Sequence, residues 1–185
     1  VNFTGGKTFS FYGTSYSSYF VNDNGSITFG SGSGDFVESF DAHFAKPRIS
    51  ALFDDLTVSQ QRPVRLQQLA DRAVVTWVNV PEFGNANQNS VQVEMFFDTG
   101  VIRITHLDLA ALDGIVGLSR GQGTPPDLVE SDLSAYALCN QNFTISGTVT
   151  ETGAGPLQGV TINGLPGSPV TDANGCTATS NVIVS

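Results

Sequence analysis

The sequence predicts an all-β protein: an antiparallel β-sandwich domain followed by a small β module. Two patterns support this fold class. Apolar residues alternate with period two over several short segments, and segments with helical periodicity are scarce. The composition agrees, because 20 Gly and 13 Phe in 185 residues are typical of β-strands joined by tight turns.

The clearest pair of strands is a predicted hairpin over residues 91–107. Apolar residues occupy the odd positions of 91–97, the turn sequence Asp-Thr-Gly follows at 98–100, and alternation resumes over 101–107. The best helical candidate, 65–72, is short and uncapped, so we expect a strand that enters a turn. Residues 107–113 could form one helical turn. Further short strands are expected at 27–29, 48–53, 74–80 and 115–118.

A hairpin turn is also predicted where Asn22-Asp23-Asn24-Gly25 separates two short apolar runs. This acidic tip lacks the ligand spacing of an EF-hand calcium loop. Asn and Gly instead supply the positive φ angles that a tight hairpin turn requires. We interpret it as a turn rather than a calcium loop.

The charge of the chain excludes several classes of function. Its net charge is −9 and it contains two lysines, Lys7 and Lys46, so no basic patch is available for nucleic acid or an anionic membrane. No apolar run approaches the roughly 20 residues that span a bilayer. We expect neither nucleic-acid binding nor membrane insertion, and we expect any export signal to lie outside the given sequence.

Asp54 and Asp55 follow the apolar run ISALF and are the candidate metal ligands. Calcium takes carboxylate oxygens, but neighbouring strand residues point to opposite faces, which makes a shared ion difficult. The alternative is a turn in which these carboxylates accept backbone N–H bonds. No other cofactor is expected.

One stretch matches the sequence of a catalytic motif but lacks the structural context that the motif requires. Gly117-Leu118-Ser119-Arg120-Gly121 matches the nucleophile elbow of α/β-hydrolases, which needs a helix after the serine. The residues that follow, GQGTPP, cannot form that helix. Neither His106, on an apolar strand face, nor His43, after a loop-like acidic stretch, offers a partner base. We therefore expect no enzyme.

Aromatic residues allow two interpretations. Trp77 lies in a strand and is expected in the core rather than on a sugar-stacking surface. Tyr12, Tyr16 and Tyr19 cluster near the N-terminus, where they could line a glycan groove or cover an edge of the sandwich.

Three N-x-[ST] sequons are candidate glycosylation sites: Asn2, Asn24 and Asn142. The two cysteines, Cys139 and Cys176, are predicted to form a disulfide in an oxidising compartment, the alternative being two free thiols.

A change in composition predicts two domains. Residues 121–127 (GQGTPPD) read as a loop, and residues from about 143 onward are rich in Thr, Gly and Val with almost no charge. We place the sandwich domain at 1–138 and the small β module at 139–185.

Four stretches occur in an order that resembles a known family: 11–29 (FYGTSYSSYFVNDNGSITF), 49–56 (ISALFDDL), 74–84 (VVTWVNVPEFG) and 90–104 (SVQVEMFFDTGVIRI). They resemble the NIDO-type (nidogen-like) extracellular β domain, especially versions in bacterial secreted multidomain proteins, some of them attached to subtilisin-like proteases. The resemblance covers about residues 9–138. It implies an extracellular or cell-surface location.

Residues 145–175 resemble the opening of a carboxypeptidase-regulatory-like or Cna-B-like immunoglobulin-type module. The matching elements are GTV at 147–149, PLQGV at 156–160 and TDANG at 171–175. Such modules need roughly 70–90 residues, and this one stops after about 43, so its later strands are missing.

These observations predict a non-enzymatic extracellular structural protein that self-associates head-to-tail into a filament or surface layer. An incomplete sandwich exposes apolar positions and strand edges that another chain can pair with by β-strand addition. The alternative is a carbohydrate- or protein-binding accessory module of a secreted enzyme such as a subtilisin-like protease. The expected assembly residues are Val1, Phe3, Phe9 and Phe11 in the donor segment and Ile145, Val149, Val160, Ile162, Val182 and Val184 in the acceptor.

Overall fold

The chain divides into two compact units, Val1–Leu128 and Val129–Ser185. The computed structural model describes residues 1–132, 143–148, 150–151, 155–156, 158–161, 170–173 and 176–182. The predicted domain boundary, between residues 138 and 139, lies outside the described residues. No helix in the described part of the chain has the length and apolar character needed to cross a membrane.

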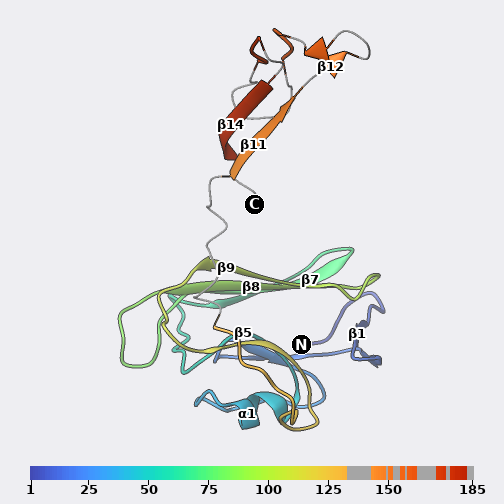
Figure 1. The fold of residues 1–185 in the computed structure, drawn as a ribbon. Coiled ribbons are helices and arrows are strands. Elements are labelled where there is room, and N and C mark those ends of the chain that lie inside the picture. The colour runs from blue at the N-terminus through green and yellow to red at the C-terminus, as the bar shows by residue number, and fades with distance from the viewer. Residues whose placement is uncertain are drawn as a thin grey trace. The chain divides into compact units, whose positions relative to one another are not determined.

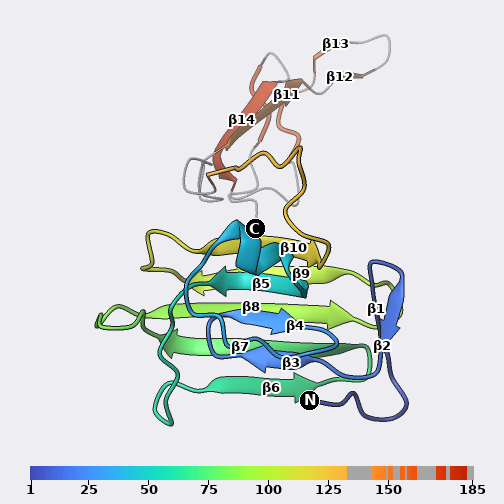
Figure 2. The same cartoon turned by 90° about the horizontal axis from the view of Figure 1, so that it is seen from below.

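Unit 1 is a sandwich of two four-stranded antiparallel sheets, which confirms the predicted fold class (Figure 1). A short helix, α1 (Phe40–Phe44), lies on the outer face of one sheet, and a β1–β2 hairpin lies at one end (Figure 2). The hairpin strands are β1 (Phe9–Phe11) and β2 (Thr14–Tyr16). The strands of the first sheet, in spatial order, are β6 (Val64–Gln68), β7 (Arg72–Val80), β8 (Asn89–Phe96) and β9 (Ile102–Asp108). The strands of the second sheet, in spatial order, are β10 (Ile115–Arg120), β5 (Pro47–Phe53), β4 (Ser26–Thr28) and β3 (Phe20–Asn22).

The core lies between the two sheets and follows the alternation in the sequence. In β7 the side chains of Ala73, Val75 and Trp77 are fully buried, whereas the residues between them are half-buried. Burial of a side chain of the size of Val75 contributes about 1.5–3 kcal/mol. Trp77 also donates its indole N–H to the backbone oxygen of Asn22, 3.2 Å away, and so links the two sheets. The predicted core position of Trp77 is confirmed.

The local predictions for hairpins and helices had different outcomes. The 91–107 hairpin is confirmed as β8 and β9, and the 65–72 segment forms strand β6 rather than a helix. The helical turn suggested for 107–113 is wrong, because the side-chain oxygen of Asn89 accepts the N–H groups of Ala110 and Ala111 and holds that segment as a loop. Helix α1 was not predicted, although Ser39 caps it by accepting the N–H of Ala42.

The N-terminal segment is part of the core of unit 1. Phe3, Phe9 and Phe11 are buried, and the amino group of Val1 donates to the backbone oxygen of Tyr19 at 2.8 Å. The segment that the sequence suggested as a donor for another chain therefore packs within unit 1 of its own chain. Donation would require these three phenylalanines to leave the core.

Unit 2 consists of short antiparallel pairs. Strand β11 (Phe143–Thr148) pairs with β14 (Cys176–Val182), and β12 (Thr150–Glu151) pairs with β13 (Gly155–Pro156). The predicted disulfide involves Cys139, which lies outside the described residues, as do Val149, Ile162 and Val184. The side chains of Ile145 and Val182 are likewise outside the description, and Val160 is half-buried.

The turn between β3 and β4 is the expected hairpin turn, and it also fixes the position of β5. Gly25 has φ +68°, and its carbonyl oxygen accepts the N–H groups of Ala51 and Leu52. A Cβ at Gly25 would lie 1.7 Å from the carbonyl oxygen of Leu52. This position therefore requires glycine for both its backbone angle and its close approach.

We expect Gly25→Ala to lower the free energy of unfolding by roughly 2–5 kcal/mol, since it adds a left-handed backbone penalty to a steric clash. Gly30→Ala is the matched control. Gly30 also has a positive φ, +81°, but a Cβ there would meet nothing within 4 Å. The control should cost roughly 1–2 kcal/mol. Equal losses in urea titrations of the two variants would contradict the clash.

Candidate metal centre

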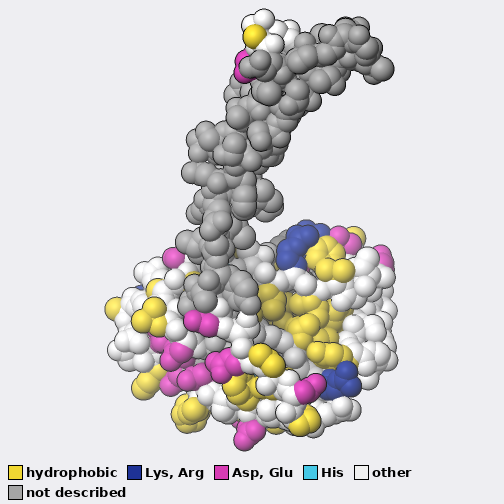
Figure 3. Space-filling model, in the orientation of Figure 1, with side chains coloured by type: hydrophobic (Ala, Val, Ile, Leu, Met, Phe, Trp, Pro, Cys, Tyr) yellow, Lys and Arg dark blue, Asp and Glu magenta, His cyan; other side chains and the backbone are white. Residues whose placement is uncertain are grey.

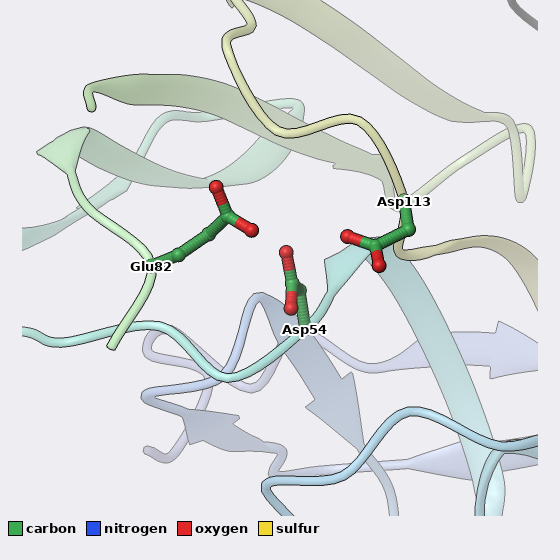
Figure 4. Close-up of side chains that lie close together, drawn as sticks. All are labelled: Asp54, Glu82 and Asp113. Atoms are coloured by element: carbon green, nitrogen blue, oxygen red, sulfur yellow. The ribbon is translucent and has the colours of Figure 1, made fainter. Parts of the chain in front are cut away.

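Three carboxylates from separate parts of unit 1 converge at one end of the sandwich. Asp54 follows β5, Glu82 follows β7, and Asp113 lies in the loop between β9 and β10. Each offers one oxygen, and the three oxygens lie within 4.8 Å of one another. Figure 4 shows the three side chains pointing toward a common space. We call these three residues the carboxylate cluster.

Asp54 is the buried member of the carboxylate cluster. The residue is 5% exposed, and its Oδ1 accepts the backbone N–H of Asp55 at 2.7 Å. Its other oxygen, Oδ2, is buried and has no hydrogen-bond partner among the described residues. A buried carboxylate oxygen without a partner is costly, and a bound cation would remove that cost.

A β-bulge places Glu82 beside Asp54. The pairing of β7 with β8 shifts register between Trp77 and Val80, and Asn79 adopts φ +52° in this bulge. The chain then reaches Glu82, which forms an isolated bridge with Leu56, two residues beyond Asp54. Asn87 binds both the backbone and the side chain of Glu82. Its Oδ1 accepts the backbone N–H of Glu82, and its Nδ2 donates to the Glu82 carboxylate.

The loop that carries Asp113 is fixed at both of its ends. Asn89 accepts the N–H groups of Ala110 and Ala111 at 2.9 and 2.8 Å. Gly114 has φ +108°, and a Cβ there would lie 2.9 Å from Cδ1 of Leu52 and 3.4 Å from Cβ of Asp54. The absence of a side chain at residue 114 therefore lets the loop approach the end of β5.

The electrostatics of the carboxylate cluster are unfavourable without a cation. Burial raises the pKa of Asp54 to about 6, and the negative charges of Glu82, Asp113 and Glu38 add to this increase, while the hydrogen bond from Asp55 opposes it. No Lys or Arg in the described part of the chain pairs with any of the three carboxylates. Figure 3 shows several Asp and Glu side chains gathered on one face of unit 1.

The ligand set suits calcium. All three side chains offer carboxylate oxygens, and the cluster contains neither the His nor the Cys that zinc prefers. Calcium takes 6–8 oxygen ligands at about 2.3–2.6 Å in flexible geometries, whereas magnesium demands a near-ideal octahedron. Three carboxylates would supply three or more of these ligands, and water would complete the shell.

The sequence identified one member of this cluster and missed two. Asp54 belongs to it, but Asp55 does not, and the backbone oxygen of Asp55 accepts the N–H of Phe83 instead. Glu82 and Asp113 were missed because each lies in a separate loop. The available signal was an acidic residue shortly after or before a strand with a glycine nearby, as in PEFG at 81–84 and LDG at 112–114.

The nucleophile-elbow match does not form a nucleophile–base pair. Ser119 lies buried in strand β10, and its hydroxyl accepts the N–H of Gly121 at 3.0 Å. His43 is buried beside a different serine, with a hydrogen bond of 2.9 Å between its Nδ1 and Oγ of Ser50. Burial lowers the pKa of His43 to about 4, with a contribution from the charge of Arg48, so the ring is neutral near pH 7.

The candidate glycosylation sites differ in their surroundings. Asn2 is exposed and forms a backbone bridge with Ser18. The Asn24 amide is already engaged, since Nδ2 donates to the backbone oxygen of Asp35 and Oδ1 accepts the N–H of Leu56. Asn142 lies outside the described residues.

In a comparison with known protein families, residues 3–154 match the family described as NIDO related. The matched region covers unit 1 from residue 3 onward and extends into unit 2. No curated protein and no solved structure matches the chain.

In calcium-free buffer at pH 7–8, we expect Asp54→Asn to raise the free energy of unfolding by about 1–3 kcal/mol. Asparagine keeps the acceptor for the N–H of Asp55 but removes the buried charge. The folded-state pKa of about 6 lies above the ordinary 3.8, so ionisation of Asp54 destabilises the fold. The advantage of the variant should therefore be small near pH 4, grow as the pH rises, and level off above about pH 7.

Thermal unfolding in a chelator across this pH range measures the effect. Asp55→Asn is the matched control, because it removes a neighbouring carboxylate outside the cluster and should show no such profile. A wild-type protein that is as stable as Asp54→Asn at pH 8 would contradict the repulsion.

Proposed function

The chain belongs to the NIDO-related family, and on that premise we propose that it is a non-catalytic extracellular structural module that binds calcium through Asp54, Glu82 and Asp113. The observation that carries the proposal is the buried, unpartnered Oδ2 of Asp54, in a residue whose carboxylate lies close to two others. The raised pKa of Asp54 supports it, because a divalent cation would relieve the repulsion that raises this pKa.

Calcium would act here as a cross-link between loops. The three carboxylates come from the end of β5, the β7–β8 loop and the β9–β10 loop, which are far apart in the sequence. Two of these loops carry exposed apolar side chains beside the cluster, with Phe83 72% and Leu112 100% exposed. An ion that joins the loops would therefore hold these side chains in fixed positions on the surface.

We expect calcium to raise the melting temperature of the wild-type protein. Extracellular calcium modules have dissociation constants of about 10⁻⁴–10⁻³ M. A calcium concentration about 100 times the dissociation constant stabilises the folded state by roughly 2.7 kcal/mol. Glu82→Gln and Asp113→Asn should each weaken calcium binding by at least about tenfold, as measured by isothermal titration calorimetry.

Two comparisons make this test specific. Asp55→Asn should bind calcium as the wild type does, and magnesium should stabilise the protein less than calcium. Equal calcium affinity in the wild type and in all the cluster variants would overturn the proposal.

Self-assembly by strand addition is a second candidate function. It is favoured by the edges of the two sheets in unit 1, since no described strand pairs with the outer sides of β3, β6, β9 or β10. Unpaired edges of this kind can accept a strand from another chain. A donor from unit 2 would leave the N-terminal phenylalanines in their own core.

Sedimentation velocity over a range of protein concentrations tests this second candidate. Assembly predicts species that grow with concentration, with and without calcium. A single monomeric species at every concentration would contradict it.

The alternative of a carbohydrate- or protein-binding accessory module is favoured by a different feature, a groove beside the β1–β2 hairpin.

A further inference from the structure

A groove of about 350 Å³ lies beside the β1–β2 hairpin of unit 1. It is distinct from the carboxylate cluster and shares no residue with it. We call it the aromatic groove. Its lining residues are Phe11, Tyr12, Thr14, Tyr16, Pro47, Arg120 and Gln122.

Tyr12 is held in a backbone conformation that its side chain does not favour. Tyr12 and Gly13 form the two-residue turn between β1 and β2, with φ angles of +47° and +81°. Turns with two positive φ angles prefer Asn-Gly, and a bulky residue there is an outlier. The ring of Tyr12 nevertheless stands at the surface, with the residue 51% exposed. Strain of this kind is often found where a side chain is presented to a ligand.

The aromatic groove has a preformed floor and wall. Phe11 contacts the rings of Tyr12 and Phe29 with centroid distances of 4.7 and 4.9 Å, and Tyr16 lies 4.8 Å from Phe29. Between the lining residues Arg120 and Gln122, Gly121 has φ +78°, and a Cβ there would come within 2.5 Å of Pro47. This close packing fixes the segment that carries Arg120 and Gln122.

The polar groups of the groove are available to a ligand. The side chains of Tyr12, Thr14, Tyr16 and Gln122 form no hydrogen bond to any residue in the described part of the chain. The guanidinium of Arg120 lies 5.2 Å from the centroid of the Tyr12 ring. No Asp or Glu lines the groove, so it carries one positive charge in a chain whose net charge is −9.

We propose that the aromatic groove binds an acidic saccharide, a hexuronate unit of an extracellular polysaccharide. A sugar ring combines an apolar C–H face, which stacks on an aromatic ring, with a rim of hydroxyl groups. Tyr12 and Tyr16 provide the rings, while Thr14 and Gln122 provide partners for hydroxyls. Arg120 pairs with the uronate carboxylate. Tyr19, the third tyrosine of this region, is buried in the core and plays no part.

Titration with trigalacturonate tests the proposal, with maltotriose as the neutral comparison. Both are followed by calorimetry in the presence of a chelator, so that the result does not depend on the carboxylate cluster. The wild type should bind trigalacturonate more tightly than maltotriose. Arg120→Gln should weaken trigalacturonate binding by at least about tenfold and leave maltotriose binding unchanged.

Tyr12→Asn separates the binding role from a folding role. Asparagine suits the positive φ of the turn, so this variant should melt at the same temperature as the wild type or higher, yet lose binding at least about tenfold. Ser15→Ala, an exposed change on the same hairpin outside the groove, should bind normally. The proposal is overturned if trigalacturonate does not bind at millimolar concentration, if either groove variant binds as the wild type does, or if maltotriose binds equally well.

Discussion

The buried carboxylate of Asp54 is the constraint on which one end of unit 1 depends. The end of β5, the bulged exit from β7 and the β9–β10 loop all approach one another around it. An ionised carboxylate in such a place needs a compensating charge or a proton. The raised pKa of Asp54 means that this carboxylate binds a proton more readily than usual. A calcium ion would instead provide the compensating charge. Everything else about the candidate metal centre follows from how the chain brings Glu82 and Asp113 into the same space.

The parts of the fold that the sequence predicted are those set by local pattern. Alternation over 74–80 and 91–107 predicted β7, β8 and β9, and the glycine at the end of the 22–25 turn predicted a backbone angle that the structure has. The buried position of Trp77 followed from its strand. In each case neighbouring residues carry the signal, because a strand face repeats every second residue.

The parts that escaped prediction depend on contacts between distant segments. Residues 109–113 lack helix because Asn89, on another strand, holds their N–H groups. Glu82 and Asp113 reach Asp54 through a bulge and a glycine contact that alternation does not reveal. Helix α1 is five residues long and too short to show a period, although its Ser39 cap was visible. Of the three residues in the carboxylate cluster, the sequence pointed to Asp54 alone, because Asp54 ends a recognisable strand and the other two do not.

The two candidate sites of unit 1 have opposite chemistry. The carboxylate cluster gathers negative charge and suits a cation, whereas the aromatic groove has one positive charge, polar side chains without hydrogen bonds to described residues, and the exposed ring of Tyr12. A NIDO-related module with both could be stabilised by calcium and bind a polysaccharide independently. The N-terminal segment contributes to both the core and the groove, because Phe11 packs against Phe29 and also supports the Tyr12 ring.

The central claim, that the carboxylate cluster holds calcium, is tested most directly by a crystal structure of the protein grown with calcium. We expect one density peak among Asp54, Glu82 and Asp113, with oxygen distances of about 2.3–2.6 Å and with Oδ2 of Asp54 among the ligands. A structure at saturating calcium with no ion at this position, and with the Asp54 carboxyl group satisfied by protein or water alone, would contradict it.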